Sequence, residues 1–160
     1  MSEVTIERRT RKVGGFDFWH VCDITPRRTA EGLVEAFMPR ERYANVRGLA
    51  LNNYGSGPFC KFAIPSSYPV SGVYVISVDN ELLYVGETAN LSARFNAGYG
   101  NISPKNCFVG GQQTNCRVNS LIFSSIQAGR TVALWFFPTD DYKTTELALR
   151  SALRLAWNRI

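Results

Sequence analysis

Two short segments of the chain each place a tyrosine beside a glycine, Gly72-Val73-Tyr74 and Tyr84-Val85-Gly86. Residues 73–78 are mostly β-branched or aromatic, residues 82–85 are apolar, and between them lies Asp79-Asn80, a pair typical of a tight turn. This pattern predicts a β-hairpin built from residues 73–78 and 82–85. The hairpin would bring the phenols of Tyr74 and Tyr84 together at one opening of the predicted site. A nearby cation could lower the pKa of Tyr74 from its ordinary value of about 10 and make that phenol a proton acceptor.

Arg94 and Glu146 add the charged groups that phosphate chemistry requires. Hydrolysis of a phosphodiester needs an activated water, a cation to balance the developing charge and help for the leaving oxygen. Arg94 follows Leu91 in a segment with helical spacing, and a guanidinium binds phosphate oxygens in pairs. Glu146 follows the apolar strand predicted at residues 131–137. Its carboxylate is a hard oxygen ligand suited to Mg²⁺ or Mn²⁺.

This arrangement resembles the GIY-YIG nuclease family. The two tripeptides stand at about the family's separation, and Arg94 lies where the family has its arginine. Glu146 lies where the family has its metal-binding glutamate, and Trp157-Asn158 looks like the Trp-Asn that often closes the family's module. The resemblance covers residues 72–158.

The resemblance implies a role for each matching residue. It makes Tyr74 the base, Tyr84 its assistant, Arg94 the phosphate ligand and Glu146 the ligand of Mg²⁺ or Mn²⁺. A phenol a few residues after the arginine occurs in some members, and Tyr99 matches it. The expected catalytic set is therefore Tyr74, Tyr84, Arg94, Tyr99, Glu146 and Asn158.

Glu87 departs from the family pattern, because many members carry a lysine directly after the second tripeptide. An acid removes a cation from the neighbourhood of the scissile phosphate. We interpret Glu87 as an exposed residue at the start of a helix, and the alternative is a second carboxylate on the metal side.

The polar, glycine-rich stretch that follows Tyr99 makes the chain look most like the small type II restriction endonucleases of the family. Gln, Asn and Arg side chains read base edges in pairs, and a helix that begins near Thr114 would attract phosphate. The alternative is a solvated loop. The residues expected to contact double-stranded DNA are Lys105, Gln112, Gln113, Asn115 and Arg117.

Each of these residues also has an ordinary structural explanation. The tyrosines could form a cross-strand pair, Glu146 could favour a helix dipole, and Asn158 could cap a helix C-terminus. Arg94 could be a solvated helix residue. The coincidence of all of them with one family's pattern favours the nuclease hypothesis.

The elements that must position these residues indicate an α/β fold. We expect a small, mainly antiparallel three-stranded sheet flanked by helices, the strands being residues 73–78, 82–85 and 131–137. Helices are predicted over about 89–97, from Thr114 to Gly129, and after Asp140 or Asp141. The Pro- and Ser-rich stretch at 64–72 predicts a boundary between an N-terminal extension, residues 1–70, and a GIY-YIG-like nuclease domain, residues 71–160. Within the extension, residues 16–24 suggest a strand, 30–37 a short helix and 47–62 an ordered loop.

Composition sets the outer limits of these hypotheses. The 160 residues carry a net charge of +5, with 18 Lys and Arg against 13 Asp and Glu. Arg predominates among the cations, which suits phosphate binding.

The four cysteines form no Cys-x-x-Cys pair and are expected to be reduced thiols near the core. No apolar run approaches the roughly 20 residues that span a bilayer, and the first residues do not resemble a secretory signal, so we expect no membrane association and a cytoplasmic protein.

We therefore expect a Mg²⁺-dependent DNA endonuclease, sequence-specific and of restriction type, that acts as a homodimer on double-stranded DNA. The extension would contribute to DNA binding or to the dimer contact. The alternatives are a structure- or damage-directed nuclease of repair or recombination, and a non-cleaving nucleic-acid-binding module that keeps the fold.

Overall fold

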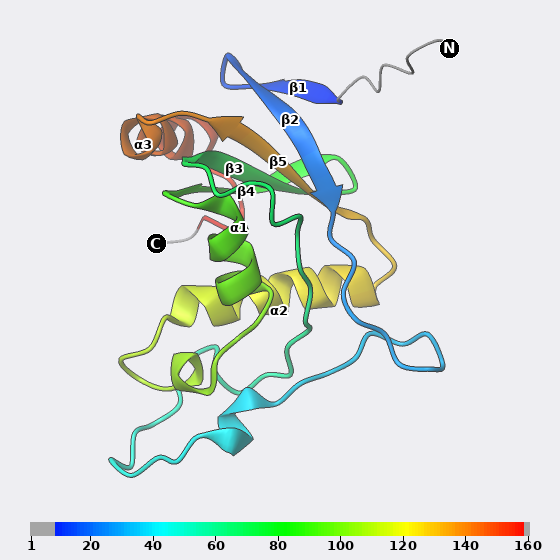
Figure 1. Ribbon diagram of the computed structural model, residues 1–160, viewed down its shortest axis with the longest axis vertical. Coiled ribbons are helices and arrows are strands. Elements are labelled where there is room, and N and C mark those ends of the chain that lie inside the picture. The colour runs from blue at the N-terminus through cyan, green and yellow to red at the C-terminus, as the bar shows by residue number, and fades with distance from the viewer. Residues whose placement is uncertain (1–8, 159–160) are drawn as a thin grey trace.

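The computed structural model describes residues 9–158, which form a five-stranded antiparallel sheet with the strand order β1-β2-β5-β3-β4 (Figure 1). The α/β class is confirmed. The strands are β1 (Thr10–Val13), β2 (Phe16–Asp23), β3 (Gly72–Val78), β4 (Glu81–Thr88) and β5 (Val132–Pro138).

Helices cover both faces of this sheet (Figure 1). On one face lie α1 (Leu91–Arg94), which continues into a π-helical turn (Phe95–Tyr99), and α2 (Gln113–Gln127). On the other face lies α3 (Tyr142–Leu153). The sheet residues alternate between two apolar cores. Tyr74, Ile76 and Tyr84 face α1 and α2, whereas Val73, Val75 and Val85 face α3.

The hairpin of β3 and β4 forms as its sequence predicts. Tyr74 pairs with Gly86, and Asp79 and Asn80 form the turn with φ angles of 50° and 70°. These left-handed angles match the right-handed twist of the strands, and Asn and Asp tolerate them better than most residues. In the sheet, β3 lies between β4 and β5, so each tyrosine-bearing segment is held by regular backbone pairing.

The predicted three-stranded sheet is wrong, because the N-terminal region supplies two more strands. Gly14 and Gly15, both at positive φ, form a tight turn that pairs β1 with β2. β2 then pairs with β5, with Trp19 opposite Phe136. The strand expected over 16–24 is therefore part of the sheet that holds the tyrosines.

The helix expected over residues 30–37 does not form. Gly32 adopts a φ of 84°, the backbone turns so that Thr29 N–H donates to the Leu33 carbonyl at 2.8 Å, and Arg28 bridges to Val34. Residues 43–62 form a loop with isolated bridges, in agreement with the ordered loop expected over 47–62. It packs against residues 101–112, where Tyr43 stacks on Phe108 with ring centroids 4.6 Å apart.

The cysteines are all free thiols, as their spacing predicts. Cys60, Cys107 and Cys116 are buried, and Cys22 is half-buried. Burial raises the pKa of Cys22 to about 11 and that of Cys60 to about 12, so both thiols remain protonated near neutral pH. Among residues 9–158, no helix combines the length and the apolar character that a membrane crossing requires.

The C-terminal segment protects the exposed edge of the sheet. β4 is an edge strand, whose outward backbone groups would otherwise be unpaired. Asn158 Nδ2 donates to the Val85 carbonyl and its Oδ1 accepts from Val85 N–H, each at 2.8 Å. Trp157 N–H donates to the Leu83 carbonyl at 2.8 Å. The chain end therefore fixes β4 at the position of the second tripeptide.

Replacing Asn158 with Asp tests this clamp. The carboxylate keeps the acceptor but turns a negative oxygen toward the Val85 carbonyl, so we expect a loss of about 1–3 kcal/mol in the free energy of unfolding at pH 7. A protonated Asp can donate, which raises its pKa in the folded state. The loss should therefore vanish as the pH falls below about 4.

Urea denaturation at both pH values measures the effect. Asn53→Asp makes the same charge change at an exposed position and should change the stability by less than about 0.5 kcal/mol. Equal effects of the two substitutions would show that the clamp does not stabilise β4.

Candidate active site

Three tyrosine hydroxyls meet beneath α1. Tyr74 Oη lies 2.6 Å from Tyr99 Oη, and Tyr84 Oη lies 3.3 Å from the same atom. Tyr74 comes from β3, Tyr84 from β4 and Tyr99 from the end of the π-helical turn. Tyr74 and Tyr99 are fully buried, whereas Tyr84 is 7% exposed. The structure thus brings together all three phenols that the sequence selected.

Arg94 completes this cluster, which we call the tyrosine–arginine cluster (Tyr74, Tyr84, Tyr99 and Arg94). Its Nη2 donates to Tyr99 Oη at 2.8 Å, and its guanidinium carbon lies 4.3 Å from the centroid of the Tyr99 ring. Tyr99 Oη can accept from Arg94 and from one phenol while it donates its own proton to the other. Every hydrogen-bonding position of that hydroxyl is therefore used.

Gly86 is required by this packing. A Cβ atom at this position would lie 2.3 Å from Tyr74 Oη and 2.4 Å from the ring carbon that bears it. No side chain fits at such distances, so the glycine of the second tripeptide lets the phenol of the first lie across the edge strand. The two tripeptides thus meet in one contact, since Tyr74 and Gly86 are also paired in the sheet.

The local sequence also fixes the position of Arg94. Asn90 begins the helix, and its Oδ1 accepts from Ala93 N–H at 3.0 Å. Arg94 Nη1 donates to Asn115 Oδ1 at 3.0 Å, and Asn115 Nδ2 donates to Gln112 Oε1 at 3.0 Å. Among the described residues, Arg94 forms no ion pair with a carboxylate. Its half-buried charge is therefore bound only to neutral groups.

The cluster keeps its phenols protonated. Burial raises the pKa of Tyr74, and neighbouring Tyr84 raises it further, while Arg94 acts in the opposite direction. Burial also raises the pKa values of Tyr84 and Tyr99. Arg94 thus has the lowering effect expected from the sequence, but burial outweighs it, so each phenol carries its proton at neutral pH.

Glu146 belongs to the other face of the sheet. It lies on α3, is 8% exposed, and its Oε1 lies 3.5 Å from Arg150 Nε. Burial raises the pKa of Glu146, the charge of Arg150 lowers it, and the nearby carboxylate of Glu87 raises it. Glu87 is half-buried at the end of β4, not exposed at the start of a helix as we expected. No hydrogen bond or ion pair within residues 9–158 joins Glu146 to the tyrosine–arginine cluster.

The pair of Glu146 and Glu87 suits a divalent cation. A positive ion would offset the charge of Glu87 that helps to raise the pKa of Glu146, and both carboxylates are hard oxygen ligands. Mg²⁺ takes one or two protein carboxylates and completes its coordination with water and substrate oxygens. In the described part of the chain, no group of three or more His, Cys, Asp or Glu side chains could hold a metal.

The residues expected to contact DNA divide into two groups. Lys105, Gln112 and Gln113 are exposed. Asn115 is buried and binds Arg94, while Arg117 is half-buried and donates through Nη1 to the Trp157 carbonyl. These two side chains are therefore engaged inside the chain. Asn158 is engaged as well, in its clamp on Val85.

Asn119 was not selected from the sequence, yet it supports the cluster. It is fully buried, and its Nδ2 donates to the carbonyls of Tyr99 at 2.7 Å and Cys60 at 2.8 Å. The only sequence signal is an amide on the apolar face of a helix. Because a buried amide needs hydrogen-bond partners, such a position predicts a structural contact.

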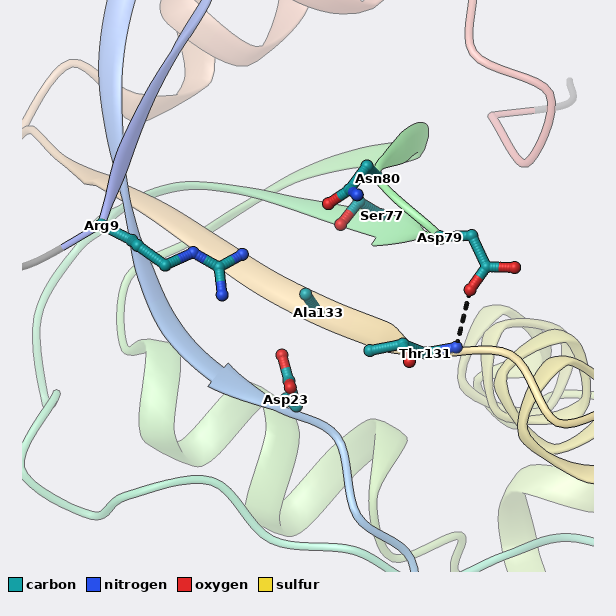
Figure 2. A pocket seen from close by; sticks show the side chains of 7 residues that line it. All are labelled: Arg9, Asp23, Ser77, Asp79, Asn80, Thr131 and Ala133. Carbon is teal, nitrogen blue, oxygen red and sulfur yellow. Dashed lines mark hydrogen bonds between the residues drawn. The ribbon is translucent and has the colours of Figure 1, made fainter.

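A different hollow lies at the turn end of the hairpin, away from the tyrosines. Its volume is about 360 Å³, and it is lined by residues that include Arg9, Asp23, Ser77 and Asp79. Figure 2 shows Asp79 directed toward Thr131, whose N–H it accepts at 2.9 Å, with Arg9 and Asp23 on other sides of the hollow. This hollow mixes cationic and anionic groups.

Comparisons with known proteins add one similarity. No protein-family model matches the sequence, and no curated protein matches it. Among solved structures, the chain is similar to a mutant of bacteriophage T4 EndoII, with 20% sequence identity and a TM-score of 0.48. The match covers 69% of this chain and 87% of that chain.

Replacing Glu87 with Gln tests the charge of the carboxylate pair. The raised pKa of Glu146 means that its ionisation opposes folding, so the cost is present at neutral pH and absent where both groups are protonated. We expect Glu87→Gln to stabilise the protein by a few tenths to about 1 kcal/mol at pH 7, and not at pH values below about 3.5.

Thermal unfolding at the two pH values measures this difference. Glu81→Gln, on the exposed start of the same strand, is the matched control and should have little effect at either pH. If the Glu87→Gln variant were no more stable than this control at pH 7, repulsion between the carboxylates of Glu87 and Glu146 would not destabilise the protein.

Proposed function

We propose that this protein is a metal-dependent DNA endonuclease of the GIY-YIG type. The observation that carries the proposal is the tyrosine–arginine cluster, in which three side chains, from β3, β4 and α1, converge on the Oη atom of Tyr99 in the π-helical turn. Within residues 9–158 the Arg94 guanidinium has no carboxylate partner, and because it lies against a group of phenols it can receive a phosphodiester oxygen. The same phenols can hold or pass a proton.

The chemistry divides between the two carboxylates on the α3 face and the cluster on the α1 face, so one phosphodiester group would have to reach both around the edge strand β4. Glu146, with Glu87 beside it, would hold Mg²⁺ or Mn²⁺, and the cation would supply charge stabilisation and an acidified water when bound. Arg94 would bind and orient the phosphate. Tyr74 is the proton acceptor of the proposal, and Tyr84 and Tyr99 position its hydroxyl. Burial keeps Tyr74 protonated in the free protein, so it would accept a proton only after its own proton has passed to another group, a loss that a bound cation would favour.

The proposed substrate is double-stranded DNA, cut at a specific sequence by a homodimer. One cluster per chain offers one cutting centre, whereas a double-strand cut needs two, and a two-fold dimer on a palindromic site provides them. Light scattering of an inactive variant with a short cognate duplex distinguishes two chains per duplex from one.

Incubation of the protein with plasmid DNA and Mg²⁺ tests the proposal. Discrete fragments, abolished by EDTA, are the expected result. Nicking or smearing would favour a structure- or damage-directed nuclease instead. A gel shift with intact DNA would indicate a binding module and contradict the proposed activity.

Glu146→Gln tests the metal role. The amide keeps the size of the side chain but loses the charge that would hold the cation, so we expect cleavage to be abolished while duplex affinity changes little. Mn²⁺ should raise the melting temperature of the wild-type protein and not that of the variant, because binding to the folded state stabilises it. Glu81→Gln serves as the control. Cleavage close to the wild-type rate at saturating Mg²⁺ would exclude Glu146 from the reaction.

Tyr74→Phe tests the proton acceptor. The ring and its packing remain, so we expect a modest change in stability and a fall of about 100-fold or more in the cleavage rate. Tyr43→Phe is the matched control, because it also removes one phenol hydroxyl but lies outside the tyrosine–arginine cluster, where the Tyr43 ring stacks on Phe108. A Tyr74→Phe variant with lower stability but unchanged specific activity would assign Tyr74 to the core alone.

A further inference from the structure

The hollow of Figure 2 is separate from every group that the proposed function uses. Its volume is about 360 Å³, and none of its lining residues belongs to the tyrosine–arginine cluster or to the pair of Glu87 and Glu146. This size lies within the range of small-molecule sites. A ligand bound here would therefore be independent of the proposed cleavage of DNA.

Two opposite charges face this hollow without contacting each other. Figure 2 shows the Arg9 guanidinium and the Asp23 carboxylate directed toward the space over Ala133 from different sides. Among residues 9–158, Arg9 forms no ion pair, and Asp23 forms one only with His20, whose Nε2 lies 2.9 Å from Asp23 Oδ1. Asp23 Oδ2 and the N–H groups of the guanidinium are therefore left for a ligand.

Trp135 holds the positive side of the hollow in place. The guanidinium carbons of Arg9 and Arg11 each lie 5.2 Å from the centroid of its ring, so two positive charges gather on one indole. Within residues 9–158 neither guanidinium has a carboxylate partner, and Arg11 donates only to the Asn80 carbonyl, at 3.2 Å. A negative group bound beside Arg9 would offset the repulsion between the two guanidinium groups.

Ser77 adds a buried hydroxyl to the lining. The residue is 1% exposed, and its Oγ accepts from Trp135 Nε1 at 3.0 Å. In the described part of the chain, no acceptor receives the proton of the Ser77 hydroxyl. Because buried polar groups in proteins usually have their hydrogen bonds satisfied, this proton suits an oxygen atom of a ligand in the hollow.

The charges of the lining select a ligand that carries both signs. Besides Asp23, the lining includes Asp79, whose Oδ1 accepts from Thr131 N–H at 2.9 Å and whose carboxylate is directed toward Thr131 in Figure 2. A ligand with only negative charge would be repelled by Asp23 and Asp79, and one with only positive charge would be repelled by Arg9. A carboxylate and an ammonium group on one small molecule satisfy both sides of the hollow.

We propose that this hollow binds a free α-amino acid in its zwitterionic form. Arg9 and Ser77 donate to the α-carboxylate, and Asp23 accepts from the α-ammonium group. Trp135 is a positioning residue, because it stacks with the Arg9 guanidinium. His20 positions the Asp23 carboxylate in the same way, through their hydrogen bond. The two charged groups of an α-amino acid are joined by one carbon atom, so a single small ligand bridges the two sides.

Two pairs of variants test the two charges. Arg9→Gln removes the positive side of the hollow, and Lys12→Gln makes the same charge change outside it. Asp23→Asn removes the negative side, and Asp17→Asn is its matched control. Lys12 Nζ and Asp17 Oδ1 lie 3.2 Å apart in an exposed ion pair on β1 and β2. All four positions are exposed, so the fold is retained in each variant.

NMR titration of the whole protein measures the binding. The common L-amino acids are added one at a time at pH 7 and constant ionic strength, and we expect saturable shifts of the backbone amides of Ser77, Thr131 and Ala133. The amino acid that binds most tightly is then compared with its N-acetyl derivative and its amide. Each derivative should bind at least about 10-fold more weakly, because it lacks one of the two charges.

The variants should divide in the same way. We expect Arg9→Gln and Asp23→Asn to weaken the affinity for that amino acid by about 10-fold or more, and the two controls by less than about 2-fold. The absence of a saturable shift with every amino acid, or equal losses in a variant and its control, would overturn the site. A derivative that binds as tightly as the parent amino acid would also contradict it, because a single charge would then suffice. None of these outcomes depends on DNA, so the nuclease proposal and this site fail or stand separately.

Discussion

The half-buried guanidinium of Arg94, which among residues 9–158 is bound only to neutral acceptors, is the constraint around which the candidate site is organised. Removing a cation from water is costly unless other groups replace its hydration. Here a phenol oxygen and an amide oxygen do so, and the Tyr99 ring covers one side of the charge. These contacts fix the guanidinium in position but leave its charge unbalanced, so an anionic ligand would complete the arrangement.

The remaining features of this face hold those acceptors in place. The π-helical turn carries Tyr99 to the hydroxyls of β3 and β4, Asn119 binds the Tyr99 carbonyl, and Gly86 leaves room for the phenol of Tyr74. On the opposite face, Glu146 and Glu87 form a separate centre of negative charge. The edge strand β4 lies between the two centres, and Asn158 closes that edge at Val85.

Local signals allowed the hairpin and its residues to be predicted from sequence. Asp79-Asn80 marks the turn, the β-branched runs mark the strands, and the spacing of Leu91 and Phe95 marks the helix that carries Arg94. β1 was missed because it is short and mostly polar, although Gly14-Gly15 is itself a hairpin signal.

Long-range contacts could not be predicted in the same way. Asn115 lies next to glutamines in a polar stretch, and only its hydrogen bond to Arg94, 21 residues away, makes it part of the interior. Arg117 reaches the Trp157 carbonyl across 40 residues of sequence. The helix expected near Gly32 failed for a local reason, since the backbone there adopts positive φ.

The cleavage rate of Arg94→Lys, measured on plasmid DNA with Mg²⁺ beside the wild-type protein, tests the central role of the guanidinium most directly. Lysine keeps the charge but cannot hold Tyr99 and Asn115 together through a planar fork. The account predicts Mg²⁺-dependent cleavage by the wild-type protein and a rate at least about 100-fold lower for the variant, with duplex affinity changed by only a few-fold. A wild-type protein that leaves DNA intact, or a variant that cleaves at the wild-type rate, would contradict it.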